Sequence, residues 1–214
     1  MAANGTLEPM HAPRRAPGLR RITWLALGFE SILLGVAIAL GWLVGNPPFQ
    51  GSHFGMTAVL GGVAATIPLL LLMRWSVLSR WPPVVRFAGE VEARLLPMFA
   101  GCSTLDLVIV SVAAGVGEEA LFRGVIQVGL ADRFGPLAGL TAASALFGLA
   151  HMVSPLYALL AGLVGAYLGG LTLATGNLVP AILAHALYDF LALSYLLRRH
   201  RRKPAAVAVK TTDS

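Results

Sequence analysis

The sequence is poor in charged side chains. Only 12% of its 214 residues are Asp, Glu, Lys or Arg, and 57% are hydrophobic, whereas about 25% of an ordinary soluble domain is charged. A soluble domain of this length would need a polar shell that so few charges can hardly supply. The composition therefore indicates an integral membrane protein, with the lipid bilayer as its surroundings.

Cysteine is nearly absent as well. Cys102 is the only one, which excludes an intrachain disulfide and any cysteine-rich metal site, and leaves the redox compartment open. The chain also lacks a basic or aromatic stripe on a soluble element, which argues against a nucleic-acid partner despite the net charge of +6.

Apolar residues are abundant, and they fall in blocks whose length is close to the roughly 20 residues that a helix needs to cross a membrane. Six such spans are predicted, all helical because lipid requires backbone groups to be satisfied within the segment. The third and fourth are weaker, since polar residues and glycines interrupt them. The predicted fold class is all-α, a polytopic transmembrane helical bundle. The spans cover residues 24–44, 55–73, 105–127, 136–153, 156–175 and 178–197.

Basic residues gather before the first span, between the second and third, and after the sixth. One topology, with both termini cytoplasmic, places all three clusters inside, as the positive-inside rule requires. The predicted location is the inner membrane of a bacterial cell. Segment 82–100 has two readings, an amphipathic helix on the cytoplasmic surface or a partly ordered loop. The chain divides into a basic segment 1–21, two spans and a connection 22–104, a core of about four spans 105–197 and a disordered basic tail 198–214.

Ionisable residues inside spans are the candidates for function. Each costs about 2.5 to 3.5 kcal/mol near the middle of a bilayer, so such groups usually face the bundle interior. Glu30 lies close enough to the start of the first span to reach the interface, and Asp106 and Asp132 are expected to be solvated at span ends. The remaining ionisable groups within spans are Glu118, Glu119 and Arg123, then His151, and then His185 with Asp189.

The two adjacent glutamates cannot do the same job, because neighbours on a helix point about 100° apart. Glu119 and Arg123 stand four residues apart with the acid first, the favoured order for an ion pair. Glu118 is left without a local counter-charge. A desolvated carboxylate of this kind suits a general base, so Glu118 is the predicted activator of water.

Two further pairs have helical spacing. Asp189 can accept the imidazole N–H of His185, or both can face one ligand. Phe147 and His151 share a face, so the aromatic ring can wall a site into which the imidazole points. His151 lies nearer the cytoplasmic end of its predicted span than Glu118 and His185 do, so either the fourth span extends further or the site lies in a water-filled cavity open to the cytoplasm. The cavity is favoured, because a carboxylate that activates water needs water beside it. Such a site activates water on Glu118 or through a metal, although the spacing differs from that of soluble H-E-x-x-H zincins.

These residues resemble the motifs of the CAAX-protease and bacteriocin-processing family (CPBP, also called Abi), intramembrane endopeptidases that include the eukaryotic prenyl-protein endopeptidase Rce1. The resemblance spans roughly residues 105–197, and the first two spans show none. Its three motifs are "EEALFR" from Glu118 to Arg123, "FGLAH" from Phe147 to His151 and "HALYD" from His185 to Asp189.

The resemblance implies hydrolysis of a peptide bond in a membrane-anchored or membrane-proximal protein or peptide. Glu118 would activate the water, assisted by His151. His185 and Asp189 would position the water, stabilise the oxyanion or, with His151, bind a divalent metal such as zinc. The family has been described both as metalloproteases and as glutamate-dependent proteases, and this sequence leaves both open. The supporting residues would be Glu119, Arg123 and Phe147.

Asp189 departs from the eukaryotic prenyl-processing members, which have asparagine at this position. An amide-donor role is therefore in doubt, and an orienting or ligand role is favoured. Many bacterial relatives have no prenylated substrate, so the resemblance does not predict one here.

Three other functions remain open. Ser144 and His151 are seven residues apart, as a serine protease dyad would require, although no glycine-flanked nucleophile turn surrounds Ser144. A proton- or ion-coupled carrier could use the same polar groups, but no inverted repeat is visible. A non-catalytic immunity or scaffold protein of similar sequence is the third.

Overall fold

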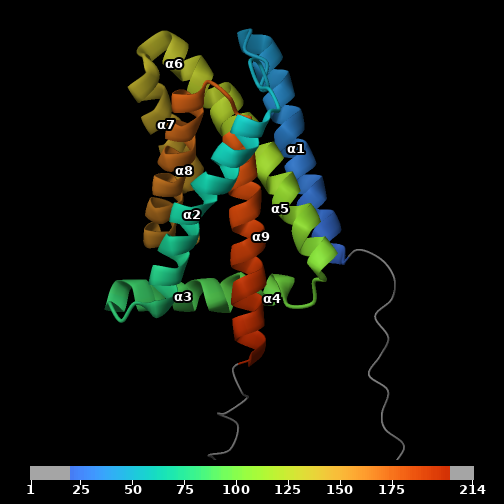
Figure 1. Ribbon diagram of the computed structural model, residues 1–214, viewed down its shortest axis with the longest axis vertical. Helices are drawn as coiled ribbons and strands as arrows, with labels where there is room; N and C mark the ends of the chain where they lie inside the picture. Colours follow the sequence, from blue (N-terminus) through green and yellow to red (C-terminus); the bar gives the residue numbers. More distant parts are fainter. Residues whose placement is uncertain (1–19, 203–214) are drawn as a thin grey trace, which may run out of the picture.

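The computed structural model describes residues 20–202, and within that part of the chain every regular element is a helix (Figure 1). The predicted all-α bundle is therefore confirmed. Residues 1–19 of the predicted basic segment and 203–214 of the predicted tail lie outside the described residues, while Arg198–Arg202 continue the last helix. The elements are α1 (Arg21–Val44), α2 (Met56–Leu78), α3 (Pro82–Arg94), α4 (Leu96–Phe99), α5 (Thr104–Glu119), η1 (Ala120–Gln127), α6 (Val128–Phe134), α7 (Pro136–Ala150), α8 (Pro155–Thr175) and α9 (Val179–Arg202).

The number of full spans differs from the predicted six. By length and composition, four described helices can cross a membrane, namely α1, α2, α8 and α9, or up to five if a bent pair forms one span. That pair joins Pro82–Phe99 to Thr104–Phe134 at 113°. The predicted fourth span, α7, has only 15 residues, about 22 Å of helix, which is shorter than a hydrocarbon layer of roughly 30 Å.

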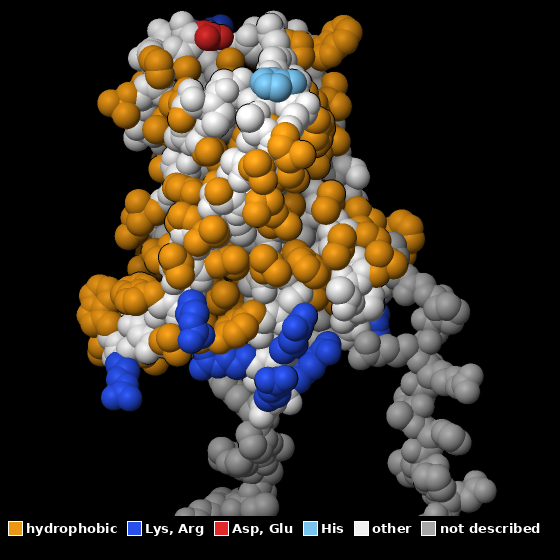
Figure 2. All heavy atoms as spheres, viewed as in Figure 1, with side chains coloured by type: hydrophobic (Ala, Val, Ile, Leu, Met, Phe, Trp, Pro, Cys, Tyr) orange, Lys and Arg blue, Asp and Glu red, His pale blue; other side chains and the backbone are white. Residues whose placement is uncertain are grey.

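Both ends of the described chain lie at the same end of the bundle, because α1 and α9 run in opposite directions (Figure 1). The helix α3 lies across this end, so segment 82–100 is mostly helical rather than a loop. Arginine side chains gather here beneath a belt of apolar side chains (Figure 2). That this end faces the cytoplasm stays a prediction from the positive-inside rule.

The helix α5 lies between α1 and α9 (Figure 1) and approaches both closely. A Cβ atom on Gly115 would stand 2.9 Å from the carbonyl oxygen of Ile182 in α9, and one on Gly117 would stand 2.8 Å from the carbonyl oxygen of Glu30 in α1. Glycine at these two positions therefore permits the contact on each side of α5. Gly115 and Gly117 lie just before Glu118 in α5, so their close contacts help to fix the position of Glu118 in the bundle.

The start of α5 is held by Asp106, which the sequence analysis wrongly placed in solvent. Asp106 is only 2% exposed. Its Oδ1 atom accepts hydrogen bonds from the Thr23 hydroxyl at 2.7 Å and the Arg20 backbone N–H at 3.0 Å, while Oδ2 closes a capping box with Ser103. The reason is tertiary, because the first turn of α1 covers the first turn of α5. Asp132 is exposed, as expected.

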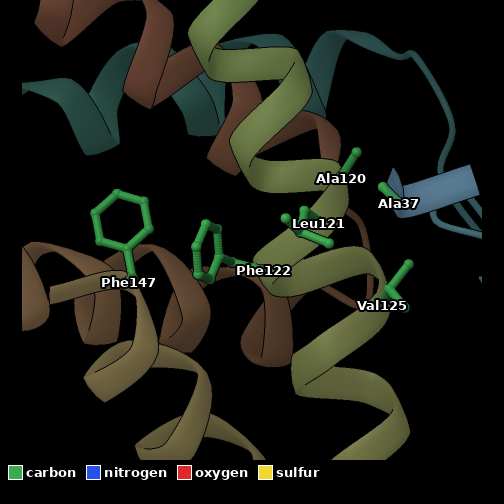
Figure 3. Packing of buried hydrophobic residues seen from close by; sticks show 6 residues of the cluster. All are labelled: Ala37, Ala120, Leu121, Phe122, Val125 and Phe147. Carbon is green, nitrogen blue, oxygen red and sulfur yellow. The ribbon is translucent and has the colours of Figure 1, made fainter. Parts of the chain in front are cut away.

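A buried apolar cluster follows the two glutamates and joins α1, η1 and α7 (Figure 3). The rings of Phe122 and Phe147 meet edge to face with centroids 5.1 Å apart. The chain from Ala120 to Gln127 is a π-helix, a rare form that is frequently found at functional sites. The cluster thereby fixes the segment that carries Arg123. Its members are Ala37, Ala120, Leu121, Phe122, Val125 and Phe147.

Candidate active site

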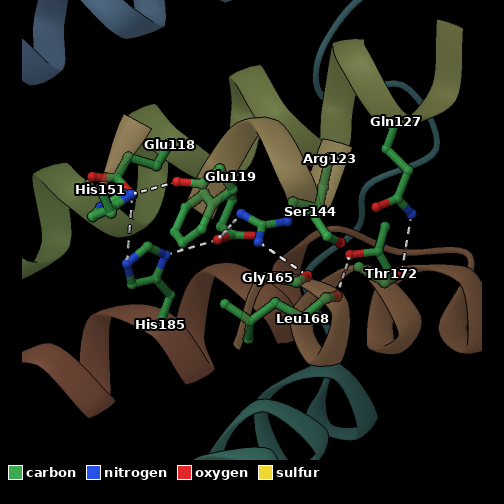
Figure 4. A network of polar contacts seen from close by, with 12 residues as sticks. Glu118, Glu119, Arg123, Gln127, Ser144, His151, Gly165, Leu168, Thr172 and His185 are labelled. Atoms are coloured by element: carbon green, nitrogen blue, oxygen red, sulfur yellow. Dashed lines mark hydrogen bonds and ion pairs between the residues drawn. The ribbon is translucent and has the colours of Figure 1, made fainter. Parts of the chain in front are cut away.

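Glu118 is the point at which the site converges (Figure 4). It lies one residue before the end of α5 and is buried. Its Oε2 atom is 3.6 Å from Nε2 of His151, which follows α7, and 3.9 Å from Nε2 of His185 in α9. These distances exceed a direct hydrogen bond, and Oε2 is enclosed without a hydrogen-bond partner among the described residues. The structure thus brings an unpaired carboxylate against two imidazoles from separate helices.

Glu119 is turned away from its neighbour and is fully buried. Its Oε1 atom accepts a hydrogen bond from Nη1 of Arg123 at 2.8 Å, so the expected ion pair is present. The same oxygen lies 2.7 Å from Nδ1 of His185, a contact that the sequence did not predict. Spacing within one helix could identify the first partner, but the second comes from α9 and depends on how the helices pack.

Asp189 lies one turn beyond His185 on α9, with Oδ2 3.5 Å from Nε2 of the imidazole. This separation is at the limit of a hydrogen bond. The carboxylate that holds the imidazole through Nδ1 is Glu119, and of the two predicted arrangements for Asp189, the one in which it and His185 face a common ligand stays a prediction. Asp189 instead faces the same ring nitrogen as Glu118 does.

The hydrogen-bond partners place a hydrogen on Nδ1 of each imidazole. Nδ1 of His151 lies 2.9 Å from the carbonyl oxygen of Phe147, and because a carbonyl only accepts, Nδ1 carries the hydrogen. Nδ1 of His185 likewise donates to the Glu119 carboxylate. Both Nε2 atoms are thus left facing Glu118, free to bind water or exchange a proton.

Phe147 lies between Arg123 and His151. Its ring centroid is 4.4 Å from that of His151 and 4.3 Å from the guanidinium carbon of Arg123, a cation–π arrangement. Nη2 of Arg123 also donates to the carbonyl oxygen of Gly165 at 3.1 Å. The aromatic ring therefore walls the site, as its position in the sequence indicated, and also covers the buried charge.

Gln127 is a further buried polar residue, and the sequence analysis missed it. It stands one turn after Arg123 and donates through Nε2 to the carbonyl oxygen of Gly169 at 3.0 Å. Gly165 and Gly169 are also one turn apart, so two side chains of η1 bind two successive turns of α8. Gln127 is uncharged, and a search for ionisable groups in spans therefore passes over it.

Glu30 is also misplaced by the sequence analysis, which had it reach the membrane interface. Its side chain is buried within the bundle, and its Oε2 atom would stand 2.9 Å from a Cβ on Gly117. Distance from the start of a span does not say which face of the helix a residue occupies, and here it is the face packed on α5.

A cavity of about 340 Å³ extends from these groups toward α3. Glu118, His151, His185 and Asp189 line one end, and the rest of the wall is mostly apolar. His151 directly follows α7, which ends at Ala150, and lies beside Glu118 at this end of the cavity. The walls beyond the site include Leu72, Trp75, Trp81, Phe87, Tyr157 and Leu196.

Metal binding by His151, His185 and Asp189 finds no support in this arrangement. Among residues 20–202 no group of three or more His, Cys, Asp or Glu is placed to hold a metal ion. The three predicted ligands are therefore not arranged as a metal site among the described residues.

Neither Ser144 nor Cys102 is placed to act as a nucleophile. The hydroxyl of Ser144 donates to the carbonyl oxygen of Leu140 at 2.7 Å, a contact within its own helix, rather than to His151. Cys102 is buried, and burial raises the pKa of its thiol, which disfavours the reactive thiolate.

We expect Ser144→Ala to retain cleavage within about twofold of the wild type, because the lost hydrogen bond is local and neutral. The measurement is cleavage of a membrane-anchored reporter by membranes that contain equal amounts of the two proteins. A hundredfold loss of cleavage by the folded variant would instead favour Ser144 and His151 as a serine protease dyad.

Comparison with known proteins gives one family. Residues 101–191 match the family described as Type II CAAX prenyl endopeptidase Rce1-like. The match contains all three motifs and confirms the resemblance predicted from them. No curated protein and no solved structure matches the chain.

Proposed function

We propose that this integral membrane protein, whose core matches a family of CAAX prenyl endopeptidases, is an intramembrane endopeptidase that uses Glu118 to activate water. The family supports protease activity in general. The observation that carries the finer proposal is the convergence of Glu118 on the Nε2 atoms of His151 and His185.

In the proposed reaction a water molecule binds between the Glu118 carboxylate and the two imidazoles. Glu118 takes one proton from the water while the oxygen of that water attacks the carbonyl carbon of the scissile peptide. The C–O bond forms, the carbonyl oxygen becomes an oxyanion, and the C–N bond then breaks. Glu118 returns its proton to the leaving amine, which restores the carboxylate.

His185 is the group best placed to stabilise the oxyanion. It is flanked by the carboxylates of Glu119 and Asp189, which compensate the charge of an imidazolium. A donor held in place before the reaction stabilises developing negative charge without reorganisation. His151 is only partly buried and opens onto the cavity, so its proposed role is to orient the water.

The cavity indicates the kind of substrate. Its wall beyond the polar end is built largely from apolar side chains of α2, α3 and α8, which would bind an apolar segment rather than a charged peptide. A membrane-anchored or membrane-proximal protein or peptide has such a segment beside its cleavage site. We therefore place the scissile bond at Glu118 and the apolar segment in the cavity.

The test is a proteomic comparison of membranes from cells that express the wild type or Glu118→Ala. We expect at least one membrane protein to accumulate as a longer precursor with Glu118→Ala, because cleavage stops. The matched control is Asp132→Asn, which alters an exposed carboxylate on α6 and should leave the precursor processed. If no precursor accumulates while the variant is folded and abundant, the endopeptidase proposal is wrong and a carrier becomes the better explanation.

A further inference from the structure

A second cavity, which we term the outer cavity, lies at the basic end of the bundle. It has a volume of about 360 Å³ and is formed by the end of α2, the helix α3 and the end of α9. None of the four predicted catalytic residues lines it. The outer cavity is nevertheless next to the hydrolytic cavity, because five residues line both. These residues are Ser76, Val77, Ala88, Val91 and Leu196.

The outer cavity has an amphipathic wall. Apolar side chains come from all three helices, and they include Val77 in α2, Val85 in α3 and Leu196 in α9. Its polar and charged side chains are Ser76, Ser79, Glu92, Arg199 and His200. Sites for small ligands have volumes of roughly 300 to 1,000 Å³. The wall and the volume therefore suit the polar head of an amphipathic ligand.

Arg199 has hydrogen-bond donors to spare. Its Nη1 atom lies 3.4 Å from the carbonyl oxygen of Val77, which is a long contact, whereas a guanidinium has five N–H groups and can give two of them to one phosphate. Ser79 accepts a hydrogen bond from the backbone N–H of Trp81 at 3.2 Å, and its own O–H can also donate. Arg199 and Ser79 can therefore donate to an anionic group that binds in the outer cavity.

The surroundings of the outer cavity are positively charged, because arginine side chains gather at this end of the bundle (Figure 2). Glu92 contributes a carboxylate to the wall, which by itself would repel an anion. However, its Oε1 atom lies 3.1 Å from Nδ1 of His200, and a protonated imidazole would neutralise it. The guanidinium of Arg199 then gives the wall a net positive charge.

The outer cavity lies at the depth where lipid headgroups are expected. The helix α2 is apolar enough to cross a membrane and ends at Leu78, directly before Ser79. Leu78 and Trp81 are each 61% exposed, and tryptophan is enriched where hydrocarbon meets headgroups. Val85, which lines the outer cavity, is half exposed. A lipid could therefore place its phosphate in the outer cavity and lay its acyl chains over these apolar side chains.

We propose that the outer cavity binds the headgroup of an anionic phospholipid, with Arg199 and Ser79 as donors to the phosphate. Basic pockets between membrane-spanning helices bind such headgroups. A hydrated inorganic anion would meet the same arginine but would leave the apolar part of the wall in water. Lipid binding does not depend on the proposed reaction. Because the two cavities share residues of α3, the bound lipid would also hold α3 over the hydrolytic cavity.

The test is native mass spectrometry of the full-length protein, released from detergent micelles to which phosphatidylglycerol or phosphatidylcholine has been added. We expect one phosphatidylglycerol to bind saturably and about tenfold more tightly than phosphatidylcholine, because only phosphatidylglycerol has a net negative charge. Arg199→Gln should raise the Kd for phosphatidylglycerol by about tenfold, since a charge-assisted contact with the phosphate is lost.

The matched control is Arg198→Gln. It removes the same charge from the same helix, at an exposed position that does not line the outer cavity. Neighbours on a helix point about 100° apart, so the Arg198 side chain leaves α9 in another direction. The Kd of this variant should stay within about twofold of the wild type, because an exposed charge is screened.

A second variant tests the outer cavity without a change of charge. Gly89 lines the cavity, and a Cβ atom there would meet no other atom within 4 Å. Gly89→Leu therefore adds bulk to the wall without a clash at Cβ. This variant should also weaken the binding of phosphatidylglycerol, and gel filtration checks that it is folded.

Equal losses of affinity in Arg198→Gln and Arg199→Gln would overturn the proposal, because they would report diffuse attraction to a basic surface. Equal affinity for the two lipids would overturn it too, and so would wild-type affinity in both Arg199→Gln and Gly89→Leu. Displacement of the lipid by inorganic phosphate, but not by chloride at equal ionic strength, would assign the outer cavity to a free anion instead.

Discussion

Cleavage by Glu118→Gln is expected to fall by about a thousandfold, with the protein folded and the substrate still bound. Glutamine keeps the size of the side chain but cannot accept a proton from water, and general-base catalysis contributes roughly 100- to 10,000-fold. The measurement is kcat and KM for the precursor found in the proteomic comparison, supplied to the purified protein in vesicles. The loss should lie in kcat, because glutamine preserves the shape of the cavity.

A variant of His151 provides the control for this prediction. His151→Gln alone should also lower kcat, but adding it to Glu118→Gln should cost little more, because residues that act on one water are not additive. The double variant therefore separates a shared water from two independent effects. Activity of Glu118→Gln within tenfold of the wild type would contradict the assignment of the base.

Arg123→Ala is expected to give the largest loss of stability. Removing one partner of a buried ion pair costs about 3 to 5 kcal/mol, because the remaining charge is buried without compensation. Here Glu119 would lose Arg123 while it still holds Nδ1 of His185. The measurement is thermal unfolding of the purified protein in detergent.

Arg133→Ala supplies the matched control, since Arg133 is exposed on α6. Exposed ion pairs and charges contribute about 1 kcal/mol or less to stability, so this variant should unfold at nearly the same temperature as the wild type. Equal unfolding temperatures for the Arg123 and Arg133 variants would show that the buried pair does not hold the core.

Much of the sequence analysis rested on the spacing of residues within single helices. Glu119 and Arg123 lie four residues apart and do form an ion pair, and the three motifs were assigned to separate helices that the structure brings together around Glu118. Patterns of this kind are visible because one helix places residues four apart on one face.

Contacts that depend on how the helices pack could not be predicted from the sequence. The link from Glu119 to His185, the burial of Asp106 under α1 and the inward position of Glu30 each join residues far apart in the chain. The length of α7 was also not predictable from hydropathy. Residues 136–153 are apolar enough for a span, but the helix ends at Ala150 and His151 follows it at the site.

The division of labour among the helices has an evolutionary consequence. The groups that would perform the chemistry come from α5, the end of α7 and α9, whereas α2 and α3 contribute only walls to the cavity, with side chains such as Trp75 and Phe87. Mutations in those walls can reshape the chamber while Glu118 and its imidazoles stay where they are. A lineage could therefore acquire new targets by drift at these wall positions, with no change at Glu118 or its imidazoles.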